Sequence, residues 1–127
     1  MASELKKCFA SGLKSLHQAK QCHCLLLRLG LHQDTYLINL LLRSSLHFSA
    51  TQYATVVFSQ TPHPNIFLYN TLIRGMVSND AFRDAVSFYT SMRQHAFAPD
   101  NFTFPFVLKA CTRLPHYFRV GLSLHSL

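Results

Sequence analysis

Residues 66–74, IFLYNTLIR, follow the pattern of residues 35–43, TYLINLLLR, which come earlier in the same chain. A shift of 31 residues superposes Asn39 on Asn70 and keeps apolar residues matched over roughly twenty positions. A second shift, of 35 residues, carries the apolar end of the later stretch onto residues 107–110. Because these offsets preserve both polar and apolar positions, the sequence predicts an array of repeated units.

Each unit contains two helical patterns of different kinds. Residues 68–77 are apolar almost all round, which is typical of a helix buried between neighbours. The second pattern repeats apolar residues every three or four positions, which predicts a second helix with one buried face. Its members are Phe82, Ala85, Val86, Tyr89 and Met92. Asn79 and Asp80 are expected to separate the two helices and to cap the second one, and Pro99 is expected to stop it.

The repeat spacing divides the chain into four units, 1–34, 35–65, 66–100 and 101–127. A single helical hairpin cannot bury its apolar face, so neighbouring hairpins must stack to form a continuous core. We therefore predict an all-α fold, a short right-handed solenoid of antiparallel helical hairpins whose first helices line a concave face. In the last unit, Thr103 is expected to cap the first helix.

The composition limits the classes of protein to which this chain can belong. Hydrophobic residues make up 49% of the 127 residues and charged residues 13%, which excludes an intrinsically disordered chain. The apolar runs are only a few residues long, whereas a membrane span needs about 18 or more, so no membrane association is expected. Twelve Lys and Arg against five Asp and Glu give a net charge of +7, which favours nucleic acid or an anionic surface as partner. Many small proteins are basic without a specific site, and the charge alone leaves both interpretations open.

The cysteines and histidines do not form the pattern of a metal site or a catalytic site. Cys22, His23 and Cys24 are adjacent, but residues two apart on a helix point about 200° away from each other, which disfavours a shared tetrahedral ion. We interpret His23 as a core or interface residue. Neither a nucleophile with its base nor a glycine-rich phosphate loop occurs, so no metal, cofactor, small-molecule substrate or enzymatic activity is expected. The four cysteines lack the spacing of a disulfide framework and fit a reducing compartment or an organelle matrix.

Residues 66–100 resemble a pentatricopeptide repeat, the unit of a plant-rich family of organellar RNA-binding proteins. The matching residues are Tyr69, Asn70, Thr71, Leu72, Ile73, Ala85, Phe88, Tyr89, Met92, Pro99 and Asp100. This unit has 35 residues, the length of the family's standard repeat. Residues 35–65 resemble a short repeat of 31 residues, and residues 1–34 and 101–127 resemble partial long repeats. The order is similar to that of the subfamily that alternates standard, long and short repeats.

The tetratricopeptide repeat, a helical hairpin of about 34 residues, is the closest alternative. Its signature begins with Trp, and this chain contains no Trp. Residues 19–23 and 121–125 instead resemble the Gly-x-x-x-His stretch of long pentatricopeptide repeats. The resemblance covers essentially the whole chain, which stops inside an expected helix and therefore looks like a truncated product or a fragment.

The resemblance implies that each unit reads one base of single-stranded RNA with its fifth and last residues. Carried onto this sequence, Asn70 pairs with Asp100, and Asn39 pairs with Asn65. An Asn amide offers two donor hydrogens and an acceptor oxygen, so it suits the edge of a pyrimidine. The first pair implies uracil, and the second implies cytosine over uracil. Pro105 stands at the equivalent position of the last unit and offers no side-chain hydrogen bond.

Each of these positions also has a structural interpretation. An Asn in the first turns of a helix often caps the helix or lies exposed, although its recurrence at matched positions favours base contact. Arg43 and Arg74 recur at one offset and could contact phosphates, but a solvated face is the preferred interpretation. The run of Phe102, Phe104 and Phe106 could stack on bases, but we expect it to be core because it opens a buried helix.

Two functions of different classes follow from these observations. The first is a sequence-specific, single-stranded RNA-binding module of an organellar RNA-processing or RNA-editing factor, with other RNA-processing proteins as further partners. The resemblance locates such a protein in a mitochondrion or a chloroplast, but no clear Arg- and Ser-rich transit peptide opens the chain. The second is a helical-repeat adaptor that binds proteins and not RNA. The salt dependence of RNA binding separates the two.

Overall fold

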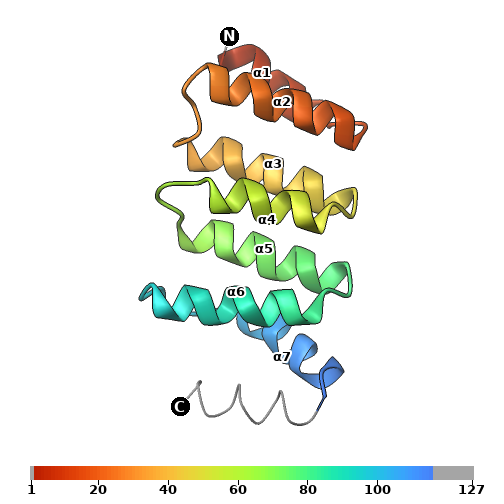
Figure 1. The fold of residues 1–127 in the computed structure, drawn as a ribbon, viewed down its shortest axis with the longest axis vertical. Coiled ribbons are helices and arrows are strands. Elements are labelled where there is room, and N and C mark those ends of the chain that lie inside the picture. The colour runs from red at the N-terminus through yellow and green to blue at the C-terminus, as the bar shows by residue number, and fades with distance from the viewer. Residues whose placement is uncertain (1, 116–127) are drawn as a thin grey trace.

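The computed structural model describes residues 2–115, and all regular structure in that part of the chain is α-helical. Seven helices follow one another along these residues (Figure 1). They are α1 (Ala2–Ala10), α2 (Leu16–Arg28), α3 (Thr35–His47), α4 (Thr51–Ser59), α5 (Ile66–Ser78), α6 (Phe82–Gln94) and α7 (Phe104–Arg113). The prediction of an all-α fold is confirmed.

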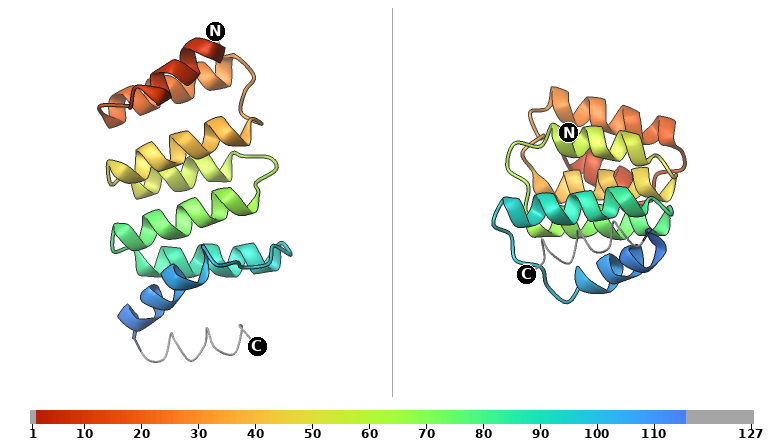
Figure 2. Two further views of the ribbon diagram at one scale, coloured as in Figure 1. Left: turned by 180° about the vertical axis from the view of Figure 1, so that it is seen from behind. Right: turned by 60° about the horizontal axis from the view of Figure 1, so that its bottom comes forward.

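Consecutive helices form antiparallel hairpins, and the hairpins stack in two layers (Figures 1 and 2). The first helices, α1, α3, α5 and α7, form one layer, and α2, α4 and α6 form the other. α3 packs against α2, α4 and α5, and α5 packs against α3, α4, α6 and α7. Each central first helix is thus enclosed by neighbours from both layers, which is the arrangement of a helical-repeat solenoid.

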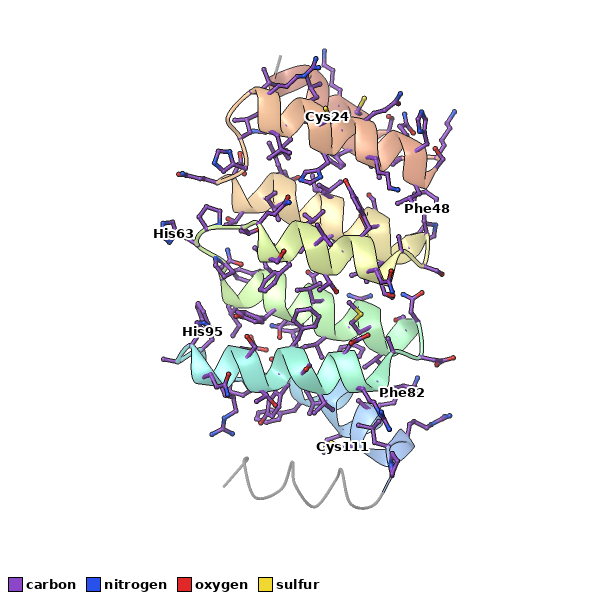
Figure 3. All side chains as sticks on the ribbon, viewed as in Figure 1. Cys24, Phe48, His63, Phe82, His95 and Cys111 are labelled. Atoms are coloured by element: carbon purple, nitrogen blue, oxygen red, sulfur yellow. The ribbon has the colours of Figure 1, made fainter. Side chains whose placement is uncertain are left out.

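The two layers bury different patterns of residues, as the sequence predicts. α5 buries apolar side chains around much of its circumference, namely Leu68, Tyr69, Leu72, Ile73, Met76 and Val77. α6 buries a single stripe made of Ala85, Val86, Tyr89 and Met92. Figure 3 shows side chains filling the space between successive helices. Full burial of an aliphatic side chain contributes about 1.5–3 kcal/mol, so the apolar first helices supply much of the stabilisation.

The turn between α5 and α6 differs from the predicted one. Asn79 is the C-cap of α5, and Asp80 has a left-handed conformation with a φ of 57°. The N-cap of α6 is Ala81, which makes no side-chain capping bond. Nδ2 of Asn79 donates to the carbonyl of Gly75 at 2.8 Å and to the carbonyl of Leu46 at 3.0 Å. The prediction that Asn79 or Asp80 caps α6 is wrong, because the Asn79 side chain joins α5 to α3 instead.

The second helix of this unit ends before its proline is reached. α6 stops at Gln94, and Ala96 has a left-handed φ of 65°. The N–H of Phe97 then donates to the carbonyl of Met92 at 3.0 Å and closes the end of the helix. Pro99 lies in the connection to α7, so the helix ends through local hydrogen bonding and not at the proline.

α3 and α5 approach one another closely at Gly75. A Cβ atom added to Gly75 would lie 2.8 Å from Cγ of Leu46 and closer still to its Cδ1. Attractive carbon contacts lie at about 3.5–4.0 Å, so this spacing of the two helices requires a glycine. The matched position of the next unit is Ala110, which is fully buried. The matched position of α7 therefore carries a buried methyl group, which the contact of α5 with Leu46 excludes at Gly75.

Two further expectations from the sequence concern membrane-spanning helices and the stretch at 121–125. Within residues 2–115, no helix is both long enough and apolar enough to cross a membrane. The long-repeat stretch at 121–125 lies outside the described residues. Of the unit at 101–127, the structure describes one helix, α7, and only this helix can be compared with the earlier units.

Candidate nucleic-acid interface

Three aromatic residues at matched positions of successive units are exposed. Tyr36 is 63% exposed, Phe67 is 69% exposed and Phe102 is 73% exposed. The shifts of 31 and 35 residues that relate the units carry Tyr36 onto Phe67 and Phe67 onto Phe102. We call the surface that bears these rings, on α3, on α5 and at the entry to α7, the first-helix face.

The asparagines that are predicted to contact bases stand on the same face. Asn39 and Asn70 each follow an exposed ring by three residues and precede Arg43 and Arg74 by four, and this spacing puts the three side chains on one side of a helix. Both asparagines are half-buried, and both arginines are exposed. α3 and α5 thus each present a ring, an amide and a cation in order along the face.

The structure brings together the two residues of the first predicted pair. Nδ2 of Asn70 donates to Oδ1 of Asp100 at 3.2 Å. Oγ1 of Thr103 donates to Oδ1 of Asn70 at 2.6 Å and lies 3.0 Å from Oδ1 of Asp100. The two ends of the Asn70 amide are therefore held by different partners, a carboxylate at the nitrogen and a hydroxyl at the oxygen.

Asp100 also organises the entry to α7. Its Oδ1 accepts from the N–H of Phe102 at 2.9 Å, and its own N–H donates to Oγ1 of Thr103 at 3.2 Å. Burial favours the neutral carboxyl and acts to raise the pKa of Asp100, but hydrogen bonds from Phe102, Thr103 and Asn70 together outweigh burial and hold the pKa below its ordinary value. The ionised carboxylate acts only as an acceptor. The predicted capping bond of Thr103 is absent, because its hydroxyl serves Asn70 and Asp100.

The second predicted pair is not joined in this way. Oδ1 of Asn39 accepts from Oγ1 of Thr71, in the next unit, at 2.5 Å. Asn65 is the N-cap of α5, and its Oδ1 accepts from the N–H of Leu68 at 3.0 Å. Among residues 2–115, no hydrogen bond joins Asn39 to Asn65. Asn65 thus has a capping role, typically worth about 1 kcal/mol, and its contact with a base stays a prediction.

A cavity of about 280 Å³ lies where the first-helix face meets the entry to α7. Its lining combines rings, amides, a hydroxyl and a cation, namely Asn39, Phe67, Asn70, Thr71, Arg74, Phe102 and Phe106. Phe102 and Phe104 are exposed, so the prediction that they are core is wrong, whereas Phe106 is half-buried and packs against the core. The reason is that α7 begins only at Phe104, which leaves Phe102 in the turn before the helix.

A second cavity, of about 260 Å³, lies between α3 and α5. It is lined by Arg43, Leu46, His47, Thr71, Arg74, Gly75, Ser78 and Asn79. Two guanidinium groups beside one cavity suit an anion such as a phosphate, because the planar guanidinium matches phosphate oxygens. Arg43 and Arg74 are exposed, as predicted, and they also line this cavity.

Cys22, His23 and Cys24 do not gather around a common point. Cys22 is buried, whereas Cys24 is exposed and is labelled on α2 in Figure 3, so the two side chains lie in different surroundings, as the helical spacing predicts. His23 is buried with its Nδ1 2.7 Å from the hydroxyl of Tyr53 on α4, and burial lowers its pKa. His23 is thus an interface residue, as predicted. Within the described part of the chain, no three His, Cys, Asp or Glu residues are arranged to hold a metal ion.

Comparison with known proteins agrees with this architecture. The model of the PPR repeat family matches residues 64–113, which include α5, α6 and α7. A pentatricopeptide repeat-containing protein of Arabidopsis thaliana is 46% identical over 113 residues, which cover 89% of this chain and 16% of the relative. The chain belongs to the pentatricopeptide repeat family.

Two further pentatricopeptide repeat-containing proteins of Arabidopsis thaliana show similar agreement. One is 41% identical over 109 residues, 86% of this chain and 16% of the relative. The other, described as chloroplastic, is 36% identical over 120 residues, 94% of this chain and 26% of the relative. The chain therefore spans only 16% to 26% of the length of these three relatives.

Sequence reasoning misses two features of this pentatricopeptide repeat surface. Tyr36, Phe67 and Phe102 recur at the same shifts as the units, so their alignment is a signal that a search for matched aromatic positions would find. Thr71 and Thr103 are the sixth and the third residues of their units. Because these positions do not match, no repeat pattern points to the two hydroxyls that hold the asparagines.

Proposed function

We propose that this chain binds single-stranded RNA along the first-helix face, with one base at each readable unit, as the RNA-binding module of an organellar RNA-processing or RNA-editing factor. The observation that carries the proposal is the cavity at Asn70, where exposed rings from two successive units accompany an oriented amide. The net charge of +7 and the exposed Arg43 and Arg74 suit a phosphodiester backbone. Membership of the pentatricopeptide repeat family supports the same function.

An unstacked base needs a flat apolar surface for its faces and polar groups for its edge. Phe67, Asn70 and Phe102 line one cavity, so a base that enters it meets two rings and an amide. Tyr36, Asn39 and Phe67 offer the same combination one unit earlier. We expect one base between Tyr36 and Phe67, facing Asn39, and a second base between Phe67 and Phe102, facing Asn70.

The base preferences are proposed from the residue pairs. Asn70 with Asp100 is proposed to select uracil, and the hydrogen bond between their side chains supports a joint role. Asn39 with Asn65 is proposed to select cytosine over uracil. The second assignment has weaker support, because the amide oxygen of Asn65 already caps α5.

The proposed cellular role includes a location and partners in addition to the contact with bases. One relative is described as chloroplastic, which supports a chloroplast or a mitochondrion as the location. Two readable units specify about two bases, so a transcript site needs additional repeats or other RNA-processing proteins as partners. The proposed role is binding, and we assign no catalytic step to any residue of the face.

Exchange of Asn70 for Thr tests the proposal. The isotopically labelled chain is titrated with short homopolymeric RNAs of uridine, cytidine, adenosine or guanosine, and NMR follows the backbone amides of Phe102 and Thr103. NMR is chosen because it detects weak binding and resolves each site. We expect the Asn70→Thr variant to prefer purine over pyrimidine at this site, with a change of about 1–3 kcal/mol, the usual size of base-edge discrimination.

Asn101→Thr is the matched control, because Asn101 is exposed and directly follows Asp100. This variant should keep the preference of the unaltered chain, and binding by both should weaken steeply with salt. An Asn70→Thr variant that still prefers the same base would identify Asn70 as a structural residue. If no signal of the first-helix face responds to any of the four RNAs, the adaptor function is favoured instead.

A further inference from the structure

The two asparagines of the first-helix face share a contact that their repeat position does not explain. Oδ1 of Asn39 accepts from the hydroxyl of Thr71 at 2.5 Å, and Oδ1 of Asn70 accepts from the hydroxyl of Thr103 at 2.6 Å. In both cases the hydroxyl comes from the following unit. Each amide oxygen is therefore occupied by a neighbouring repeat before any ligand is bound.

The two threonines are not equivalent members of the repeat. The residue matched to Thr71 in the last unit is Phe106, and the residue matched to Thr103 in the preceding unit is Leu68. Thr71 lies within α5, whereas Thr103 lies in the turn that leads into α7. Two unrelated positions thus supply the same hydrogen bond to the same atom, so the contact itself is the common feature.

We propose that Thr71 and Thr103 are positioning residues that set the base specificity of Asn39 and Asn70, an inference that rests on the proposed RNA binding. A hydroxyl hydrogen can be accepted by the oxygen of a side-chain amide but not by its nitrogen. The donated hydrogen therefore fixes which end of the amide is the acceptor. At Asn70, the single hydroxyl hydrogen of Thr103 has two acceptors within reach, and the shorter contact is to the amide, at 2.6 Å against 3.0 Å to Oδ1 of Asp100, so we take the amide oxygen as its acceptor.

The orientation of the amide determines which pyrimidine it fits. Uracil carries a carbonyl oxygen, an acceptor, where cytosine carries an amino group, a donor. An amide of fixed orientation matches only one of these patterns, whereas an amide that can turn over matches either. The hydroxyl contacts thus convert a side chain that accepts any pyrimidine into one that distinguishes uracil from cytosine.

The two sites differ in how much they depend on the hydroxyl. The nitrogen of Asn70 is also held by the carboxylate of Asp100, so its amide keeps one restraint when the Thr103 hydroxyl is removed. The hydrogen bond that holds the amide of Asn39 comes from Thr71. Loss of the Thr71 hydroxyl should therefore relax specificity at Asn39 more than loss of the Thr103 hydroxyl relaxes it at Asn70.

The exchanges Thr71→Val and Thr103→Val test this inference, because valine keeps the shape and removes the hydroxyl. The labelled chain is titrated with short RNAs of uridine or cytidine, and NMR follows the side-chain amides of Asn39 and Asn70 separately. Thr71→Val should reduce the ratio of uridine to cytidine affinity, in whichever direction it lies, by roughly fivefold at Asn39 and leave it unchanged at Asn70. Thr103→Val should reduce the ratio at Asn70, by less than roughly fivefold, and leave the ratio at Asn39 unchanged.

Serine variants and a distant threonine provide the controls. Thr71→Ser and Thr103→Ser keep the hydroxyl and should keep the ratio at both sites. Thr61→Val removes another buried hydroxyl, which bonds to the carbonyl of Val57 within its own unit, and should change neither ratio. Because Thr71 is only half-buried, its valine variant tests the inference even if Thr103→Val does not fold.

The outcomes separate this inference from the function on which it rests. An unchanged ratio at Asn39 in Thr71→Val, with RNA still bound, overturns the positioning role and leaves RNA binding intact. An equal loss of specificity in Thr71→Ser overturns it as well, because packing and not the hydroxyl would then be responsible. If neither asparagine responds to RNA in the unaltered chain, the proposed function fails and the positioning role fails with it.

Discussion

The Asn39 and Asn70 sites present the same side chain from equivalent turns of α3 and α5, but they support it differently. Asn70 is held between Asp100 and Thr103, which are themselves joined by hydrogen bonds. At the earlier site Thr71 holds Asn39, while Asn65, the residue matched to Asp100 by its place at the end of a unit, caps α5. Repeat position therefore determines where the amide stands, and the connection to the next unit determines how firmly it is held.

The junctions between the units differ in the same region. α3 and α5 meet at Gly75, where no Cβ atom fits against Leu46, whereas α7 carries the buried Ala110 at the matched position. Nδ2 of Asn79 adds one hydrogen bond that ties α5 to the carbonyl of Leu46. The Asn39 site is thus built on a tight helix contact with few polar restraints. The Asn70 site has more polar restraints, because its amide is held by both Asp100 and Thr103.

The largest expected effect comes from the ring that the two sites share. Phe67→Ala should weaken base contact at both sites, because Phe67 stands between the other two exposed rings in the series of units. Stacking of a base on an aromatic side chain is worth about 1–3 kcal/mol. NMR titration with short RNAs should show weaker binding at the amides of Asn39 and Asn70 alike.

Two single-site variants sharpen this result. Tyr36→Ala should weaken only the Asn39 site, and Phe102→Ala should weaken only the Asn70 site. All three rings are exposed, so chemical denaturation should give unfolding free energies within about 0.5 kcal/mol of the unaltered chain. Equal losses at both sites from Tyr36→Ala would contradict the expected order of bases and rings.

An effect confined to one junction, and therefore smaller in total than the loss of stacking at two sites, is expected at Gly75. Gly75→Ala places a methyl group against Leu46, so α3 and α5 must separate, and the free energy of unfolding should fall by about 1–3 kcal/mol. Chemical denaturation measures this loss. The side-chain amide signal of Asn39 should also shift more than that of Asn70, because the separation stretches its bond to Thr71.

The matched position in the preceding unit provides the control for this junction. Ser44 is half-buried and corresponds to Gly75 by the shift of 31 residues. Ser44→Ala adds no atom and should change the unfolding free energy by less than about 0.5 kcal/mol. If Gly75→Ala is as stable as Ser44→Ala, then α3 and α5 have room for a methyl group and the described spacing is not required.

The helices and their stacking are predictable from the sequence because a buried helix face requires apolar residues at regular spacings. The nearly continuous apolar run at 68–77 lies within α5, and the spaced stripe that begins at Phe82 lies on α6. The turn between them is not predictable in the same way. Asn79 is a good capping residue in principle, but a carbonyl of the neighbouring hairpin competes for its side chain.

The site is only partly predictable for a related reason. Asn39 and Asn70 recur at one offset, so repeat matching finds them, and the family resemblance supplies Asp100 as a partner. The hydroxyls of Thr71 and Thr103 arise from tertiary contacts between units, and such contacts leave no periodic signal. Sequence reasoning misses the exposure of Phe102 because an aromatic run suggests a core, whereas Phe102 lies in the turn before the start of α7.

The smallest expected effect is a pH dependence that appears at the Asn70 site and not at the Asn39 site. The pKa of Asp100 lies below its ordinary value, so its contribution to the Asn70 site is present at neutral pH and is lost as the pH falls through that lowered pKa. The carboxylate then becomes a neutral acid and accepts less well from Asn70 and Phe102.

An NMR titration should show the side-chain amide of Asn70 shifting only below about pH 3.9, the ordinary carboxyl value, while base preference stays constant between about pH 5 and 8. The amide of Asn39, whose partner is the uncharged Thr71, should show no such step. Asp100→Asn should abolish the step at Asn70. A step at or above the ordinary carboxyl pKa would instead mean that the hydrogen bonds to Asp100 are weaker than its burial, and the firm hold on Asn70 would be wrong.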